Sequence, residues 1–297
     1  MQKKEVYVIM HKLNKYLELT KPKVTLLNLL VGMTCFILAA YPTVDWVKLA
    51  VFSLVGYLAA GGCGVFNSVY DRDVDGLMAR TSRRSIPSGY ITTTKALTFG
   101  VGLIAASFIT SYILFNPLTF LMLALGLLFY LLVYTVWLKR TSPWNVVIGG
   151  FAGCFAALSG WTAVVGTLSL LPLLVSLLDF LWTPGHLWGL AIKKVKEYQK
   201  ARIPMLPVTA GLWRAAQITL AVNVLTISSS LLLPLFGLAG ILYSAVAVAA
   251  GACFLFESAK LAVSPSEARG FRVFLASMPY LAALMVGLIV DKILLVA

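Results

Sequence analysis

The sequence predicts an all-α protein, a polytopic membrane bundle of about nine transmembrane helices. Of its 297 residues, 60% are hydrophobic and only 12% are charged, about half the charged share of a soluble globular domain. The hydrophobic residues also gather into long runs, and a spanning helix needs roughly 20 of them in succession. A water-soluble fold of this length could not bury so much apolar surface, so we expect the lipid bilayer to cover it.

Pro, Gly or charged residues separate most of the apolar runs, so the number of spans is better defined than their ends. We expect residues 1–297 to form a single integral membrane domain. The first 23 residues are polar and mixed in charge, and they are expected to be a cytoplasmic tail rather than a cleavable signal peptide. The predicted spans cover residues 24–41, 47–67, 96–115, 118–138, 144–164, 168–192, 214–233, 236–256 and 273–296.

Positive charge predicts the orientation of the bundle. All 24 Lys and Arg residues except Lys48 and Lys292 lie in the N-terminal tail or in the loops that follow even-numbered spans. By the positive-inside rule, the N-terminus and these four loops are cytoplasmic, and the C-terminus lies on the outer side. The protein is expected to lie in the cell (inner) membrane. The net charge of +13 therefore reflects topology. The basic residues do not form one stripe, so no nucleic-acid partner is expected.

An acidic motif marks the cytoplasmic end of the second predicted span. Asn67, Asp71 and Asp75 follow one another at intervals of four, which places them on one helix face about 6 Å apart along the axis. Like charges at this spacing repel, so we expect a cation between them. Carboxylate and amide oxygens suit Mg²⁺, and we interpret the three residues as metal ligands and catalytic groups. The alternative is a solvated acidic loop. Asp73 points off this face and is expected to balance Arg72.

Arginines follow the acidic motif in the same loop. Arg80, Arg83 and Arg84 have guanidinium groups that match pairs of phosphate oxygens. Each one alone also satisfies the positive-inside rule. Beside an acidic metal site, however, they indicate a clamp for a diphosphate.

The loop between the fourth and fifth spans supplies more positive charge. Lys139 and Arg140 are expected to neutralise a departing diphosphate as catalytic groups. Tyr134 precedes them, and Asn145 opens the fifth span as a hydrogen-bond donor. Both are predicted to bind substrate.

The sixth predicted span contains a second set of polar residues. Asp179 lies deep in the span, where an acid is costly and indicates a function. Pro184 is expected to kink the helix and aim His186 into a cavity as a ligand or proton carrier. The alternative for His186 is a histidine whose hydrogen bonds are satisfied within the core. Trp182 belongs to the same run, and Glu197 follows in a Lys-rich stretch.

Together these stretches resemble the UbiA-type intramembrane prenyltransferases. The segment Phe180–Ile192, which reads F-L-W-T-P-G-H-L-W-G-L-A-I, and the segment Ile203–Val208 are more similar to the protohaem IX farnesyltransferase (haem O synthase) branch. The matching stretches are Thr20–Thr25, Asn67–Gly89, Tyr134–Trp161 and Asp179–Gly211.

The resemblance implies a UbiA-like fold and a prenyl-transfer reaction. A farnesyl (polyprenyl) group would pass from a prenyl diphosphate to a vinyl group of haem B, giving haem O and diphosphate. Asn67, Asp71 and Asp75 would hold Mg²⁺, while Trp182 and Glu197 would belong to the substrate site. Most superfamily members carry a second Asp-rich motif after the sixth helix. This chain has only Glu197 there, so a second Mg²⁺ stays open.

Two alternatives to haem prenylation stay open. One is another UbiA-type enzyme whose acceptor is a quinone precursor, a chlorophyllide or a glycerol phosphate lipid; the segment around His186 argues against it. The other is a carrier of haem or a lipid diphosphate without catalysis, which has little need for paired carboxylates. The expected partners are haem B, farnesyl diphosphate and the bilayer, with haem A synthase and terminal oxidase assembly proteins as candidate protein partners. The prenyl chain length is not predicted.

Overall fold

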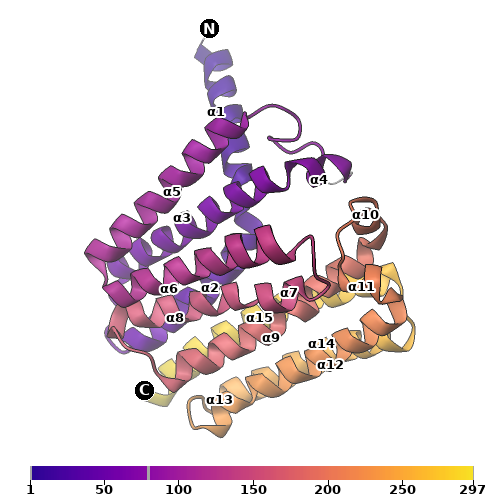
Figure 1. The fold of residues 1–297 in the computed structure, drawn as a ribbon. Coiled ribbons are helices and arrows are strands. Elements are labelled where there is room, and N and C mark those ends of the chain that lie inside the picture. The colour runs from indigo at the N-terminus through magenta and orange to yellow at the C-terminus, as the bar shows by residue number, and fades with distance from the viewer. Residues whose placement is uncertain (1, 79–80, 297) are drawn as a thin grey trace.

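A computed structural model describes residues 2–78 and 81–296 of the protein, with the side chains of residues 2–9, 23, 295 and 296 left out. The described part of the chain is helical, without a β-strand (Figure 1). Eight helices within it are long and apolar enough to cross a membrane. A ninth span results if the pair Met10–Leu19 and Val24–Ala40, bent by 65°, is counted as one. The predicted all-α bundle of about nine spans is therefore confirmed.

Most helices begin and end close to the predicted bounds. The last two spans depart most: the ninth begins at Glu267 rather than at 273, and the eighth, predicted at 236–256, lies at Ile241–Val263. The preceding turn extends to Gly240, with Gly237 at a φ of 69°. At the other end, Glu257 and Lys260 form an ion pair of 3.6 Å within the helix, so these charges do not end it.

The element bounds follow the chain in order. They are α1 (Gln2–Leu19), α2 (Pro22–Ala40), α3 (Trp46–Tyr70), α4 (Arg72–Leu77), α5 (Thr93–Leu114), α6 (Pro117–Leu128), η1 (Phe129–Leu138), α7 (Asn145–Gly149), α8 (Phe151–Val165), α9 (Leu170–Lys193), α10 (Val195–Lys200), α11 (Leu206–Thr209), α12 (Gly211–Ser230), α13 (Leu232–Leu235), α14 (Ile241–Val263) and α15 (Glu267–Val296).

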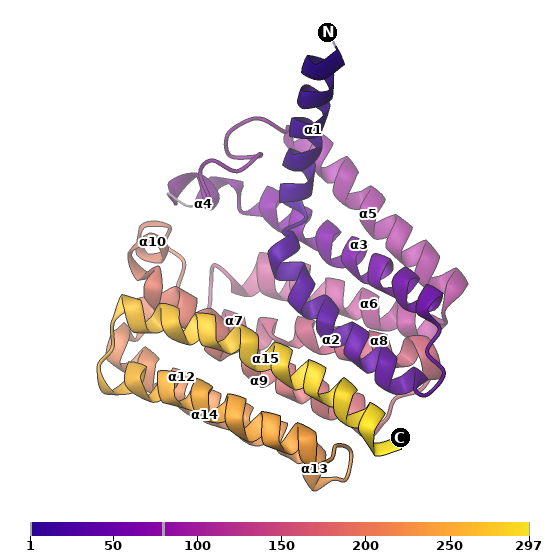
Figure 2. The same cartoon turned by 180° about the vertical axis from the view of Figure 1, so that it is seen from behind.

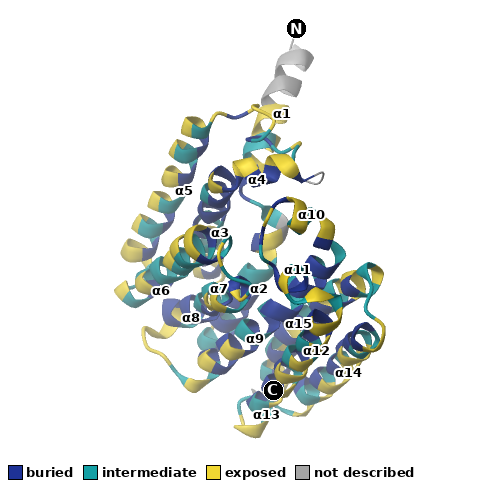
Figure 3. Cartoon of the chain, turned by 45° about the vertical axis from the view of Figure 1, so that its right-hand side comes forward, coloured by how far each residue is buried: buried dark blue, intermediate teal, exposed yellow. Residues whose placement is uncertain are grey.

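The helices differ in how much of their surface the protein itself covers. The spans of α3 and α9 are the most buried, whereas α5 and the span formed by α6 and η1 are the least. Figure 3 shows exposed residues along the outer sides of α5 and α6. Apolar residues on those faces are expected to contact lipid. The two most enclosed helices are the ones that carry the acidic motif and the histidine motif.

The short helices of the long loops gather at one end of the bundle. Helix α4 follows α3, and α10 and α11 follow α9, and both views place these elements at the same end (Figures 1 and 2). The C-terminal end of α15 lies at the opposite end. Helix α15 packs against α9, α14 and α2, so it joins the two groups of helices rather than lying at the edge. The polar loops therefore meet on one face.

Candidate active site

The acidic motif lies at the junction of α3 and α4. Helix α3 ends at Tyr70 and α4 begins at Arg72, but the helical hydrogen bonding continues across the break. Asp71 N–H donates to the Asn67 carbonyl at 2.9 Å, and Asp75 N–H donates to the Asp71 carbonyl at 2.7 Å. All three side chains of the motif are buried. The geometry keeps the predicted alignment of Asn67, Asp71 and Asp75.

Each residue of this motif holds a cation from another part of the chain. Lys139 donates to Asp71 Oδ2 from the loop after η1. Arg84 Nη1 donates to Asp75 Oδ2 at 2.9 Å from the loop after α4. These ion pairs offset the repulsion between the two carboxylates and part of the cost of burying them.

The third cation is Lys21, which the sequence analysis did not select. It lies between α1 and α2 and donates to Asn67 Oδ1. Its backbone is left-handed, with φ 51° and ψ 55°, a conformation that few non-glycine residues adopt. This turn brings the start of α2 against the end of α3. Lys21 belongs to the stretch Thr20–Thr25 that resembles the family, but its partner Asn67 lies 46 residues away and could not be inferred from spacing.

Arg140 forms a separate contact at the rim of the site. Its guanidinium donates to both oxygens of Asp73, at 2.9 and 2.7 Å, and to the Tyr70 carbonyl at 2.9 Å. These hydrogen bonds hold the pKa of Asp73 below its ordinary value and raise that of Arg140. The expectation that Asp73 balances Arg72 was wrong, because α4 turns Asp73 toward the loop after η1. Arg140 also lies 3.9 Å from Asp71 Oδ1.

A π-helical segment, η1, shapes the other side of the site. Thr135 Oγ1 accepts from Asn67 Nδ2 at 3.1 Å and donates to the Tyr130 carbonyl at 2.8 Å. This contact orients the Asn67 amide so that its oxygen faces Lys21. The Tyr134 ring lies 5.9 Å from Lys139 Nζ. π-Helical turns often occur at functional sites, where they shift the register of side chains.

The oxygen atoms of this cluster suit a magnesium ion. Asp71 Oδ1 is buried without a hydrogen-bond partner, so this carboxylate oxygen is available to a metal ion. No group of three His, Cys, Asp or Glu side chains able to hold a metal occurs in the described part of the chain. The motif offers two carboxylates and one amide. Mg²⁺ is commonly held by one or two carboxylates together with substrate phosphates, so these residues fit it.

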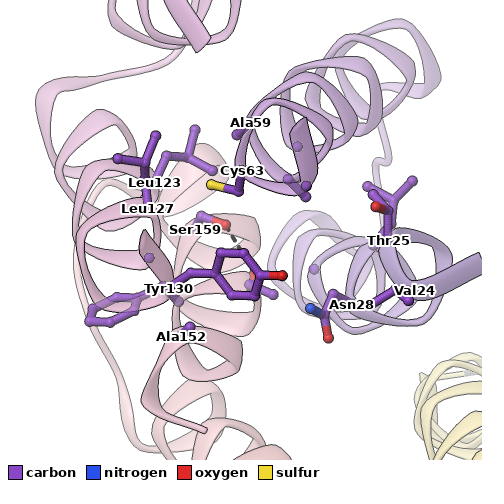
Figure 4. A pocket seen from close by; sticks show the side chains of 18 of the residues that line it. Val24, Thr25, Asn28, Ala59, Cys63, Leu123, Leu127, Tyr130, Ala152 and Ser159 are labelled. Carbon is purple, nitrogen blue, oxygen red and sulfur yellow. Dashed lines mark hydrogen bonds between the residues drawn. The ribbon is translucent and has the colours of Figure 1, made fainter. Parts of the chain in front are cut away.

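A largely apolar cavity of about 140 Å³ opens beside this cluster. It lies between α2, α3, α8 and the span formed by α6 and η1, and Lys21 is among its lining residues. Figure 4 shows Asn28 of α2, Cys63 of α3 and Tyr130 of η1 around the same space. Lys21 thus belongs both to the charged cluster and to the cavity. An apolar chain with a charged head group would match this combination.

The predicted histidine motif lies in a separate contact between α9 and α15. The His186 ring stacks on Trp182 at 4.3 Å and on Phe274 at 4.4 Å. His186 Nδ1 forms a 2.6 Å hydrogen bond with Ser277 Oγ, and Trp182 Nε1 donates to the Ser277 carbonyl at 2.8 Å. Helix α9 continues through Pro184 to Lys193. His186 is half-buried and is not among the residues that line the cavity beside Lys21, so the expected aim of His186 into a cavity is not seen there.

Asp179 lies in a third place, at the contact between α8 and α9. Only 1% of the residue is exposed, and neither carboxylate oxygen has a hydrogen-bond partner. A side chain at Gly153 of α8 would overlap Asp179 Oδ2, so glycine is what lets the acid fit there. The buried, unpaired acid that the sequence indicated is therefore present, but it does not join the Asp71 cluster through any contact that the structure shows.

The remaining predicted residues are dispersed. Asn145 is fully buried at the start of α7, where its amide donates to the Ser142 carbonyl at 2.6 Å. Glu197 on α10 forms an ion pair of 2.7 Å with Lys194. Arg83 is exposed on the loop after α4. Arg80 lies outside the described residues.

A helical membrane bundle with paired carboxylates, several cations and an adjoining apolar cavity defines a class of protein: membrane enzymes that act on lipid phosphates. Residues 26–284 match the UbiA prenyltransferase family, and the chain belongs to this family. The resemblance predicted from the motifs is thereby confirmed.

Similar proteins cover nearly the whole chain. Protoheme IX farnesyltransferase 1 of Cenarchaeum symbiosum (strain A) is 38% identical over 280 residues, 93% of this chain and 94% of the relative. Protoheme IX farnesyltransferase 2 of Vibrio campbellii is 40% identical over 280 residues, 94% of this chain and 92% of the relative. The solved structure of a UbiA homolog from Archaeoglobus fulgidus bound to DMAPP and Mg²⁺ has a TM-score of 0.77 at 19% identity, and covers 94% of this chain and 99% of that one. It shares the fold.

Proposed function

We propose that this protein transfers a farnesyl (polyprenyl) group from a prenyl diphosphate to a vinyl group of haem B in a Mg²⁺-dependent reaction. The observation that carries the proposal is the cation-paired acidic cluster at the mouth of an apolar cavity. The similarity to protoheme IX farnesyltransferases over more than nine tenths of the chain favours haem as the acceptor.

The cluster holds the diphosphate by an exchange of partners. Asn67, Asp71 and Asp75 would hold Mg²⁺, which would supply positive charge to the diphosphate. Lys139 and Arg84, now paired with the two carboxylates, then turn to phosphate oxygens. Preorganised cations of this kind stabilise the charge that develops on a leaving group.

Prenyl transfer breaks the allylic carbon–oxygen bond and the π bond of the vinyl group, and it forms a new carbon–carbon bond. The bond between the allylic carbon and the diphosphate oxygen breaks, and its electron pair leaves with the diphosphate. A vinyl carbon of haem B forms a new bond to the allylic carbon, which leaves a cation on the haem side. Water adds to that cation and loses a proton. The Tyr130 and Tyr134 rings lie near the cluster and can stabilise the allylic cation.

The aromatic contact between α9 and α15 is the place that we propose for the haem. Ser277 engages His186 Nδ1 and fixes the orientation of the imidazole beside the proposed haem site. Trp182 supports the imidazole from one face. We assign the proton from the added water to Asp179, because it lies two turns before His186 on the same face of α9 and both of its oxygens lack hydrogen-bond partners.

The charged loops also suggest the orientation. We propose that the acidic cluster and the N-terminus face the cytoplasm, and that the C-terminus lies outside. A reporter fused after Ala297 that is active only outside the cytoplasm tests this. Activity of this reporter supports the orientation. If it is inactive, and a reporter that works only in the cytoplasm is active at the same position, the orientation is reversed.

The proposed reaction is tested with detergent-purified protein, haem B, farnesyl diphosphate and Mg²⁺, followed by mass spectrometry. A haem species heavier by one farnesyl group and one water, absent with EDTA or in Asp71→Asn, is the expected result. Unmodified haem together with prenylation of a quinone precursor would overturn the haem assignment. Binding of both ligands without turnover on any acceptor would favour a carrier.

A further inference from the structure

The cavity beside Lys21 ends at a cluster of aromatic rings. Phe52 lines the cavity and is 2% exposed. Its ring centroid lies 5.5 Å from that of Phe36 and 6.1 Å from that of Phe115. These rings pack with Leu49 and Ala163 in one buried cluster at the end of the bundle opposite α4. The cluster therefore closes the cavity at the end farthest from the charged site.

The contact between α2 and α8 closes the same end from the side. A side chain at Gly160 would overlap the Gly32 carbonyl, so the two backbones touch there. A Cβ at Gly32 would lie 3.3 Å from the Phe52 ring and 3.1 Å from the Ala156 carbonyl. The floor thus consists of one large ring and two helices in close contact. At Gly32 and Gly160 the two backbones leave no space between them for a prenyl chain.

The length of the cavity follows from the helices that form its walls. Lining residues on α3 extend from Phe52 to Gly64, which is about twelve residues and about 18 Å. Along α2 they extend from Lys21, just before the helix, to Gly32, about eleven residues and about 16 Å. An isoprene unit has four main-chain carbon–carbon bonds of about 1.5 Å and advances about 5 Å when extended. Three units, about 15 Å, fill this length, whereas four, about 20 Å, exceed it.

The α3 wall leaves space for the chain above its floor. Gly56 lies one helical turn from Phe52, about 6 Å toward the charged site. A Cβ at Gly56 would meet only the end of the Leu29 side chain, at 3.3 Å. The next turns carry the small residues Ala60 and Gly64. One turn of this wall therefore corresponds to about one isoprene unit.

We propose that Phe52 is the floor of the prenyl cavity and limits the donor to three isoprene units. The identity of the ligand rests on the proposed function. The length of the ligand rests on the dimensions of the cavity. Removing the Phe52 ring lengthens the cavity by the depth of one side chain. Filling the Gly56 position raises the floor by one turn.

The test measures binding of prenyl thiolodiphosphates with two, three and four isoprene units, which bind without reacting readily. Wild-type protein is expected to prefer three units. Phe52→Ala should shift the ratio of affinities toward four units on the order of tenfold, and Gly56→Val toward two units by a similar factor. Phe36→Ala is the matched control, because Phe36 is equally buried in the same cluster but does not line the cavity.

The outcomes separate the floor from the reaction. An unchanged order of affinities in Phe52→Ala and Gly56→Val overturns the floor assignment while leaving the proposed function intact. An equal shift in Phe36→Ala also overturns it, since the preference would then follow the stability of the cluster. Failure of every analogue to bind the wild-type protein contradicts the proposed function itself. Gly56→Val removes no core contact, so it decides the question even if Phe52→Ala does not fold.

Discussion

The junction of α3 and α4 and the contact between α9 and α15 hold their polar groups in different ways. At the junction, Asp71 is paired with Lys139, 68 residues away, and Asp75 is paired with Arg84 of the loop that follows α4. Between α9 and α15, the Ser277 carbonyl accepts a hydrogen bond from the Trp182 indole, and the Ser277 hydroxyl bonds to His186. The His186 ring also stacks on its aromatic neighbours. The first region is held by charges that a ligand can redirect. The second is held by ring stacking and by hydrogen bonds to Ser277.

The largest expected effect is at the junction. Asp71→Asn removes the carboxylate that bonds Lys139 and leaves the amide without charge, so the diphosphate would lose its metal and its preorganised cation. We expect kcat for farnesyl transfer to fall about 10²- to 10³-fold. The measurement is haem prenylation by mass spectrometry at saturating Mg²⁺. Activity near that of the wild type would remove Asp71 from the reaction.

Lys21 tests whether the same region recognises the head group. Lys21→Met keeps the length of the side chain and removes its charge, and a hydrogen bond to a charged group contributes about 1.5–3 kcal/mol. The affinity for inorganic diphosphate with Mg²⁺ should therefore fall roughly 10- to 150-fold. Lys95→Met, at an exposed position at the start of α5, is the control. Equal affinities in the two variants would exclude a contact between Lys21 and the diphosphate.

The second region is tested through haem. His186→Phe keeps an aromatic ring between Trp182 and Phe274 but removes the nitrogen atoms. We expect haem B to bind about tenfold more weakly, which corresponds to one lost polar contact of about 1.4 kcal/mol. The absorbance spectrum of the bound haem should change as well. An unchanged spectrum and affinity would mean that His186 is a packed core residue.

Asp179 sharpens the comparison, because it belongs to neither region. Asp179→Asn cannot accept the proton of the added water, so the haem-side cation would lose a proton from carbon instead. The product should then include a species lighter than the hydrated haem by one water. Mass spectrometry of the product distinguishes this from a simple loss of rate. A fully hydrated product would exclude Asp179 as the proton acceptor.

The smallest expected effect is at Asp73. Arg140 holds its pKa below the ordinary value, so the pair stabilises the fold above that value and loses this effect as the pH falls through the lowered pKa. Because the side chain is 61% exposed, Asp73→Asn should cost at most about 1 kcal/mol at neutral pH. Thermal unfolding in detergent at neutral and acidic pH measures this, and the two proteins should converge at low pH. If the thermal stabilities of the two proteins instead move apart at acidic pH, the stabilising ion pair between Asp73 and Arg140 is contradicted.

Local chemistry along the chain was enough to predict the bundle and the acidic motif. Spans are recognised by uninterrupted apolar length, because the bilayer penalises each exposed polar group wherever it occurs. The alignment of Asn67, Asp71 and Asp75 follows from the helical repeat alone. The eighth span was displaced because Glu257 and Lys260 form an ion pair within the helix. A linear reading interpreted those charges as a boundary.

Contacts between distant segments required the folded structure. Lys21 reaches Asn67 across 46 residues, and Asn67 reaches Thr135 across 68. No periodicity links such positions, since their meeting depends on how α2, α3 and η1 pack. The same holds for Phe52, an ordinary apolar residue in the sequence that becomes a cavity floor only where three helices converge. Helical repeat and hydropathy act between neighbours along the chain, whereas cation pairing and cavity depth arise from helix packing.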